Sequence, residues 1–181
     1  MKWLAVVAVW AMLGVIYAAP IYVEVRAEQH GHMAWRIFTW GILTWVAWAP
    51  LTHAYLGEAY ALAGRIEEGI VALQKALSLA REHDERSYEA WTLYLMGEVH
   101  ALRNPPEPKA AEDALQQSLS LARELEMRPL EAQCHLGLGK LARQVGQNPL
   151  ARTELTTAAS MFADMDMQSW LQKVEATLGA K

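Results

Sequence analysis

LSLAREHDERSYEA at residues 77–90 returns as LSLARELEMRPLEA at residues 119–132, and nine of the fourteen positions are identical. A weaker third copy, ASMFADMDMQSW, begins at residue 159, a further 40 residues along the chain. Similarity at a fixed period of this length is typical of proteins built from repeated helical units. We therefore interpret LSLARE as the end of a helix that recurs at the same place in successive units.

Three glycines mark the units. Gly57, Gly97 and Gly139 stand in similar stretches, 40 and 42 residues apart, in which apolar and small residues recur at helical spacing. Without a side chain, each glycine allows a neighbouring helix to approach closely. Residues that end helices interrupt each stretch once, as AGR at 63–65, RNPPEPK at 103–109 and VGQNP at 145–149. Each unit is therefore predicted to hold two helices joined by a short turn.

A single helical pair cannot bury its own apolar face, so such pairs stack and the last one needs a cap. We predict an all-α fold made of three helical hairpins and a C-terminal capping helix. The hairpins are expected at about 51–89, 90–131 and 132–162, and the cap within 163–181. The cap is expected to pack apolar residues on the third hairpin, namely Trp170, Leu171 and Val174.

The glycine-centred pattern resembles the tetratricopeptide repeat, in which a large residue, Leu-Gly, Tyr and Ala recur at set spacings. The match covers about residues 50–162. It implies a short right-handed α-solenoid in which the first helix of each pair lines a concave, partner-binding surface. The chain departs from the pattern, since Gly69 replaces an Ala, His100 and Ala142 replace Tyr, and the units exceed the usual length of about 34 residues.

A second resemblance covers residues 77–178. It is carried by the stretches AREHDERSYEAWTLYLMGEVHA, LARELEMRPLEAQCHLGLGKLARQVGQ and LTTAASMFADMDMQSWLQKVEA. They are similar to the C-terminal tetratricopeptide region of bacterial signalling proteins that join an adenylate/guanylate cyclase or a similar output domain to an ATPase-type switch domain. The resemblance implies a partner-sensing or scaffolding tail. It does not imply cyclase activity, because 181 residues leave no room for the catalytic domain.

Residues 1–50 differ from the rest, since they hold six of the eight tryptophans and only five charged residues. Residues 3–23 carry no charge over 21 positions, which is enough for a helix to cross a bilayer core about 30 Å thick. We favour an uncleaved membrane anchor there over a cleaved secretory signal. The shorter run at 37–52 either completes a helical hairpin in the membrane or forms a buried helix under the first repeat. A mis-assigned start codon would instead exclude residues 1–50 from the native fold.

Composition excludes several classes of protein. The formal charge of −4 and the lack of a Lys/Arg cluster exclude the basic surface that a nucleic-acid-binding protein needs. The single cysteine, Cys134, excludes internal disulfides and is expected to be a small buried residue in a helix. We interpret HGH at 30–32 as a turn, and neither a metal nor a cofactor is predicted.

No catalytic residue is predicted either. GLGK at 137–140 suggests a phosphate-binding loop, but the required pattern fails at Cys134 and Leu141, and the periodicity places the segment inside a helix. Cys134 and His135 are adjacent, so on a helix they point about 100° apart and cannot act as a thiol–imidazole pair. His135 and His53 occupy equivalent repeat positions, where packing residues are expected.

If the first helix of each pair lines the concave surface, nine positions are expected to face a protein or peptide partner. These are Ala54, Glu58, Leu62, Trp91, Tyr94, Glu98, Leu136, Lys140 and Arg143. The set mixes aromatic, acidic and basic groups, which suits a peptide or a partner helix better than a compact metabolite. For Trp91 and Tyr94, packing against the next repeat is an equally good interpretation.

The sequence thus predicts a non-enzymatic protein-interaction module, an adaptor or scaffold tethered to a membrane by residues 1–50, with its repeats in the cytoplasm. One alternative is the sensory tail of a signalling enzyme, detached from its catalytic portion. Another is an accessory subunit of a membrane complex. For the location, the alternative is a soluble cytoplasmic protein.

Overall fold

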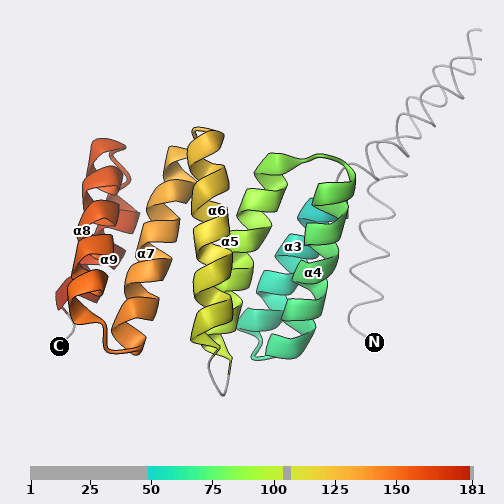
Figure 1. Cartoon of the computed structure of the whole chain (residues 1–181), viewed down its shortest axis with the longest axis horizontal. Helices are drawn as coiled ribbons and strands as arrows, with labels where there is room; N and C mark the ends of the chain where they lie inside the picture. Colours follow the sequence, from blue (N-terminus) through green and yellow to red (C-terminus); the bar gives the residue numbers. More distant parts are fainter. Residues whose placement is uncertain (1–48, 104–106, 180–181) are drawn as a thin grey trace, which may run out of the picture. The chain divides into compact units, whose positions relative to one another are not determined.

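A computed structural model describes residues 49–103 and 107–179 of the chain, and every regular element within them is an α-helix (Figure 1). The helices in this part are α3 (Ala49–Leu62), α4 (Ile66–Glu82), α5 (Arg86–Leu102), α6 (Pro108–Glu124), α7 (Arg128–Gln144), α8 (Asn148–Asp164) and α9 (Gln168–Gly179). The predicted all-α fold is confirmed for these residues.

Successive helices pack against each other from α3 to α9, which gives the hairpins α3–α4, α5–α6 and α7–α8. In addition, α3 contacts α5 and α5 contacts α7. The first helices of the three hairpins therefore form a layer of their own. In Figure 1 the turns inside the first and third hairpins lie at the lower edge of this unit and the connections between hairpins at its upper edge.

The repeated sequence marks equivalent helix ends. LSLARE ends α4 at Glu82 and α6 at Glu124, and the third copy ends α8 at Asp164. The next helix begins four residues later in each case. The steps of 42 and 40 residues in the sequence are therefore also the steps of the fold, and the prediction for LSLARE is confirmed.

Three glycines of the first helices each meet a leucine of the following helix. The pairs are Gly57 with Leu73, Gly97 with Leu115 and Gly139 with Leu155. A Cβ on these glycines would stand between 2.5 and 2.7 Å from the leucine Cγ, which is too close for any real contact. The predicted close approach of the helices is therefore confirmed, and the same contact recurs in every hairpin.

Two kinds of turn join the helices. Inside the first and third hairpins the chain turns at Gly64 and Gly146, with φ of 76° and 79°. Between hairpins the same left-handed conformation falls on acidic residues, Asp84, Glu126 and Asp166, with φ of 53° to 55°. This conformation costs an L-residue about 1–2 kcal/mol, while glycine adopts it freely. The connections between hairpins therefore carry a conformational cost that the turns at Gly64 and Gly146 avoid.

Helix α9 packs on the third hairpin. Val174 is fully buried and lies in one cluster with Phe162, Trp170 and Leu171. The rings of Phe162 and Trp170 stack with their centroids 5.5 Å apart and an interplanar angle of 16°. The predicted packing of Trp170, Leu171 and Val174 is confirmed.

The apolar run at 3–23, HGH at 30–32 and most of the run at 37–52 lie outside the described residues. The predictions made for them stay predictions. Of the helices from α3 to α9, none combines the length and the apolar character needed to cross a bilayer.

Candidate protein-interaction surface

The structure places the nine predicted residues on α3, α5 and α7, three on each helix. A step of four residues along a helix turns the side chain by about 40°, so residues at this spacing do not share one environment. On α3, Ala54 is 1% exposed, Glu58 is half-buried and Leu62 is 81% exposed. The same rise in side-chain exposure is expected along the equivalent helices, α5 and α7.

The prediction that Ala54 and Leu136 are exposed is wrong, because each is 1% exposed. For Tyr94, which is at an equivalent position and 7% exposed, the packing interpretation is confirmed. Ala54 and Tyr94 belong to the main apolar cluster, and Leu136 packs in the second cluster with Leu155 of α8. Their positions are rotated toward neighbouring helices, so they stabilise the array and offer little surface to a partner.

The other six predicted residues are half-buried or exposed. We call them, together with two further exposed residues, the odd-helix face: Tyr55, Glu58, Leu62, Trp91, Glu98, Leu102, Lys140 and Arg143. Tyr55 and Leu102 were missed by the sequence reasoning, although Leu102 stands 40 residues after Leu62 and is its repeat equivalent. The repeat register alone could have identified Leu102.

An ion pair crosses this face. Lys140 Nζ on α7 donates to Glu98 Oε2 on α5 at 3.3 Å. Gly137 makes room for the carboxylate, since a Cβ there would lie 3.0 Å from Glu98 Oε1 and 3.0 Å from Leu115 Cδ2. Gly137, the first glycine of GLGK, thus makes room on α7 for side chains of α5 and α6. The predicted helical position of this segment is confirmed.

Trp91 and Tyr94 were each expected either to face a partner or to pack against the next repeat, and they differ in burial. Their ring centroids are 5.5 Å apart, with Trp91 half-buried at the surface and Tyr94 only 7% exposed. Burial raises the pKa of the Tyr94 hydroxyl, and the nearby carboxylates of Glu98 and Glu58 raise it further. The Tyr94 hydroxyl therefore remains protonated.

Two charges on the odd-helix face are uncompensated within the part of the chain that the structure describes. Glu98 has Lys140, but neither Glu58 on α3 nor Arg143 on α7 forms an ion pair there. The face is therefore acidic toward α3 and basic toward α7.

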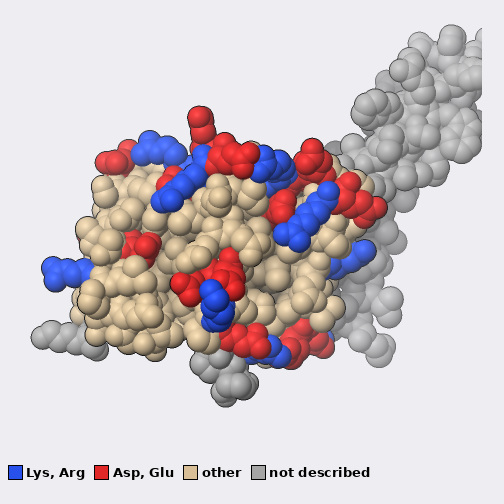
Figure 2. Space-filling model, viewed as in Figure 1, with Lys and Arg blue, Asp and Glu red and all other residues tan. Residues whose placement is uncertain are grey.

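Many of the other charged residues form ion pairs with each other. Figure 2 shows charged side chains along the upper and lower edges of the array and a further group between them. Two of these pairs recur at the repeat step. Arg81–Glu89 and Arg123–Glu131 are one equivalent set, and Arg86–Glu124 and Arg128–Asp164 are the other. These charges bind neighbouring helices together, so they are not free to recognise a partner.

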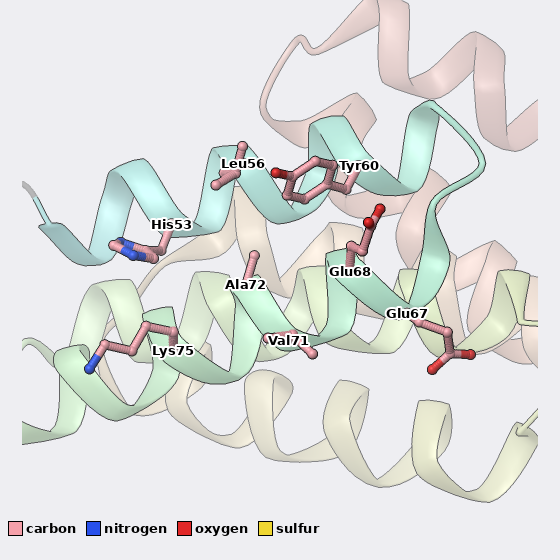
Figure 3. A pocket seen from close by; sticks show the side chains of 8 residues that line it. All are labelled: His53, Leu56, Tyr60, Glu67, Glu68, Val71, Ala72 and Lys75. Atoms are coloured by element: carbon pink, nitrogen blue, oxygen red, sulfur yellow. The ribbon is translucent and has the colours of Figure 1, made fainter. Parts of the chain in front are cut away.

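A groove of about 500 Å³ lies between α3 and α4, apart from the odd-helix face (Figure 3). It is lined by His53, Leu56 and Tyr60 of α3 and by Glu67, Glu68, Val71, Ala72 and Lys75 of α4. None of the nine predicted residues lines it. Val71 is 65% exposed, while its repeat equivalents, Asp113 and Thr153, are polar.

Cys134 is completely buried in α7, as predicted. Its thiol donates to Ser118 Oγ at 3.2 Å, and that hydroxyl donates to the carbonyl oxygen of Ala90 at 2.7 Å. Burial raises the pKa of the Cys134 thiol to about 11, so the nucleophilic thiolate is scarce at neutral pH.

His135 is 6% exposed and connects three helices. Arg123 Nη2 of α6 lies 3.1 Å from Nε2 of the imidazole, and Glu154 Oε2 of α8 lies 2.6 Å from Nδ1. Because a guanidinium can only donate, Nε2 accepts and Nδ1 carries the proton that it donates to Glu154. The predicted packing position of His135 is confirmed, and its polar contacts join the second and third hairpins.

Among residues 49–103 and 107–179, no group of three or more His, Cys, Asp and Glu side chains is placed to hold a metal ion. No model of a known protein family and no curated protein matches the chain.

Proposed function

We propose that the chain is a non-enzymatic protein-interaction module, a short right-handed α-solenoid of the tetratricopeptide type that binds a protein partner on its odd-helix face. The observation that supports this most is the uncompensated charge and apolar surface on that face. Leu62 is 81% exposed, Leu102 59% and Tyr55 55%. Exposed apolar side chains that stand among charges favour contact with another protein.

The difference between contacts that recur in every hairpin and residues that do not recur supports the same proposal. The Gly–Leu contacts and the edge ion pairs recur from hairpin to hairpin, so they serve stacking. Part of the odd-helix face differs between the hairpins, since Lys140 of α7 is the equivalent of Glu58 and Glu98. Specificity for one partner is expected where the copies differ.

The proposal is tested by affinity capture from cells with the tagged full-length chain, solubilised in mild detergent, and quantitative mass spectrometry. The test variant is Glu58→Gln/Glu98→Gln/Lys140→Gln. The control variant, Lys109→Gln/Asp113→Asn/Glu175→Gln, also removes two acids and one base, from α6 and α9. A specific partner should be recovered at least tenfold less with the test variant and unchanged with the control. Equal recovery with both variants, or no protein enriched by the wild-type chain, would refute the proposal.

The membrane tether is a further part of the proposal, supported by the uncharged run at 3–23. We place the repeats on the cytoplasmic side. The full-length chain should stay in the membrane pellet after carbonate extraction. Its release into the supernatant would show that the tether is wrong while leaving the interaction surface in place.

A second candidate function is the detached sensory tail of a bacterial signalling enzyme, favoured by the resemblance of residues 77–178 to such tails. The same capture experiment addresses it. A cyclase or ATPase-type signalling protein without a repeat region of its own should then be among the enriched partners.

A further inference from the structure

The odd-helix face carries opposite charges at its two ends. Glu58, Glu98 and Lys140 occupy equivalent positions on α3, α5 and α7, 40 and 42 residues apart in the sequence. Because Lys140 reaches Glu98 at 3.3 Å, side chains at these equivalent positions lie on one face of the array. Glu58 on α3 and Arg143 on α7 form no ion pair with any residue that the structure describes.

Glu58 and Arg143 do not neutralise each other within one chain, because α5 lies between α3 and α7 and contacts both of them. Packed helices are about 8–10 Å apart, so the axes of α3 and α7 are about 16–20 Å apart. Exposed apolar side chains accompany the two charges, with Leu62 81% exposed and Leu102 59% exposed. The acid, the base and the leucines are therefore available to a molecule outside the chain.

A second copy of the same face offers the groups that this face lacks. In a two-fold dimer, the same surface of both copies forms the interface, so every contact between different residues occurs twice. An axis that runs along α5 in the plane of the interface places α3 of each copy against α7 of the other. Glu58 then faces Arg143 of the second copy, and Leu102 of α5 lies near the axis, opposite its own equivalent.

The charges also decide between the possible axes. An axis that runs across the helices would place α3 against α3 and α7 against α7. The two copies of Glu58 would then face each other, as would the two copies of Arg143, and such like-charge contacts disfavour an interface. The face is therefore complementary to itself in only one of these two arrangements.

We propose that the protein partner of the odd-helix face is a second copy of this chain, packed face to face about a two-fold axis along α5. Glu58 of each copy pairs with Arg143 of the other, and the exposed Leu62 and Leu102 become buried in the interface. The inference rests on the proposed function, since it names the partner of that face.

The first test measures the protein mass of the full-length chain in mild detergent by light scattering, over a series of concentrations. The wild-type chain should reach twice the 20.3 kDa of one copy. Glu58→Lys places like charges together at two points and should raise the dissociation constant of the dimer at least about tenfold. Glu58→Lys/Arg143→Glu restores opposite charges across the interface and should return the dissociation constant to the wild-type value.

Glu175→Lys is the matched control, because it reverses an exposed acid on α9, away from the odd-helix face, and it should leave the dimer unchanged. Thermal melting confirms that each variant is folded.

The second test locates the axis with a short bismaleimide crosslinker. The native Cys134 is fully buried and is protected from the reagent. Leu102→Cys should form a covalent dimer, because position 102 faces its own equivalent across the axis. Leu62→Cys is the control, because the two copies of α3 lie on opposite sides of the axis, and it should remain a single chain.

The inference is overturned if the wild-type chain stays monomeric, if Glu58→Lys has no effect, or if the double reversal fails to restore the dimer. Equal crosslinking at positions 62 and 102 would also overturn it. A monomeric chain that still captures a different protein through the odd-helix face would refute the dimer and leave the proposed function intact.

Discussion

The Cγ atom of Leu115 on α6 lies 2.5 Å from the position that a Cβ would take on Gly97 of α5, so the two helices touch where one of them has no side chain. The same relation joins Gly57 to Leu73 and Gly139 to Leu155. This contact sets the distance between the helices of every hairpin. Each hairpin can then present an equivalent surface to the next one.

Gly97→Ala should therefore destabilise the fold although alanine is the better helix former. The new methyl group must displace the fully buried Leu115, and overpacking of this kind costs about 1–3 kcal/mol. Chemical denaturation of the full-length chain measures the change. Gly179→Ala is the matched control, because nothing lies within 4 Å of its Cβ position, and it should be neutral or slightly stabilising. Equal effects of the two substitutions would contradict the packing role of Gly97.

Replacing the acidic residues in left-handed turns by glycine should increase the stability of the fold. Glu126→Gly should stabilise the fold by about 0.5–1 kcal/mol, since glycine adopts a φ of 55° without strain and the substitution also removes a negative charge near a helix C-terminus. Asp84→Gly should gain less, because Asp tolerates this conformation better than Glu. Gly64→Ala should lose about 1 kcal/mol, since alanine would be strained at a φ of 76°. A loss of stability in Glu126→Gly would show that the side chain contributes more than its backbone costs.

The ion pairs along the edges of the array, such as Arg86–Glu124, predict that the fold loses stability in acid. The hydrogen bonds from Arg86 lower the pKa of Glu124 from its ordinary value of 4.5. The stabilisation is then complete above pH 4.5 and is lost as the pH falls through the lower pKa of the folded state. Melting temperatures measured between pH 7 and pH 3 should fall less steeply for Glu124→Gln than for the wild type. Glu175→Gln, which removes an exposed acid outside the edge ion pairs, should follow the wild-type curve.

The burial of Cys134 predicts that its thiol is protected from alkylation in the native chain. The thiol is fully buried and its pKa is raised to about 11, so iodoacetamide at pH 8 should label the native chain at least a hundredfold more slowly than the denatured chain. Because the chain has one cysteine, the label count reports directly on this site. Rapid labelling of the native chain would mean that α7 is not packed against Ser118 as described.

The sequence predicted the repeat step, the helix ends at LSLARE and the glycines of close approach, because these depend on local pattern and on one recurring contact. It failed for Ala54 and Leu136, because residues spaced by four drift around the helix and rotate into the core. The edge pair Arg86–Glu124 spans 38 residues and arises only when the hairpin closes. The left-handed turn at Glu126 was not indicated either, since the sequence has no glycine there to mark it.

The claim that the odd-helix face receives a protein partner is tested most directly by photo-crosslinking in cells. A photoreactive phenylalanine derivative replaces Leu62 or Leu102 on that face, or the exposed Ser120 of α6 as a control. Discrete adducts with the same partner should form from positions 62 and 102 and not from position 120. Absence of an adduct at both leucine positions, or equal adducts at all three positions, would contradict the assignment of this face.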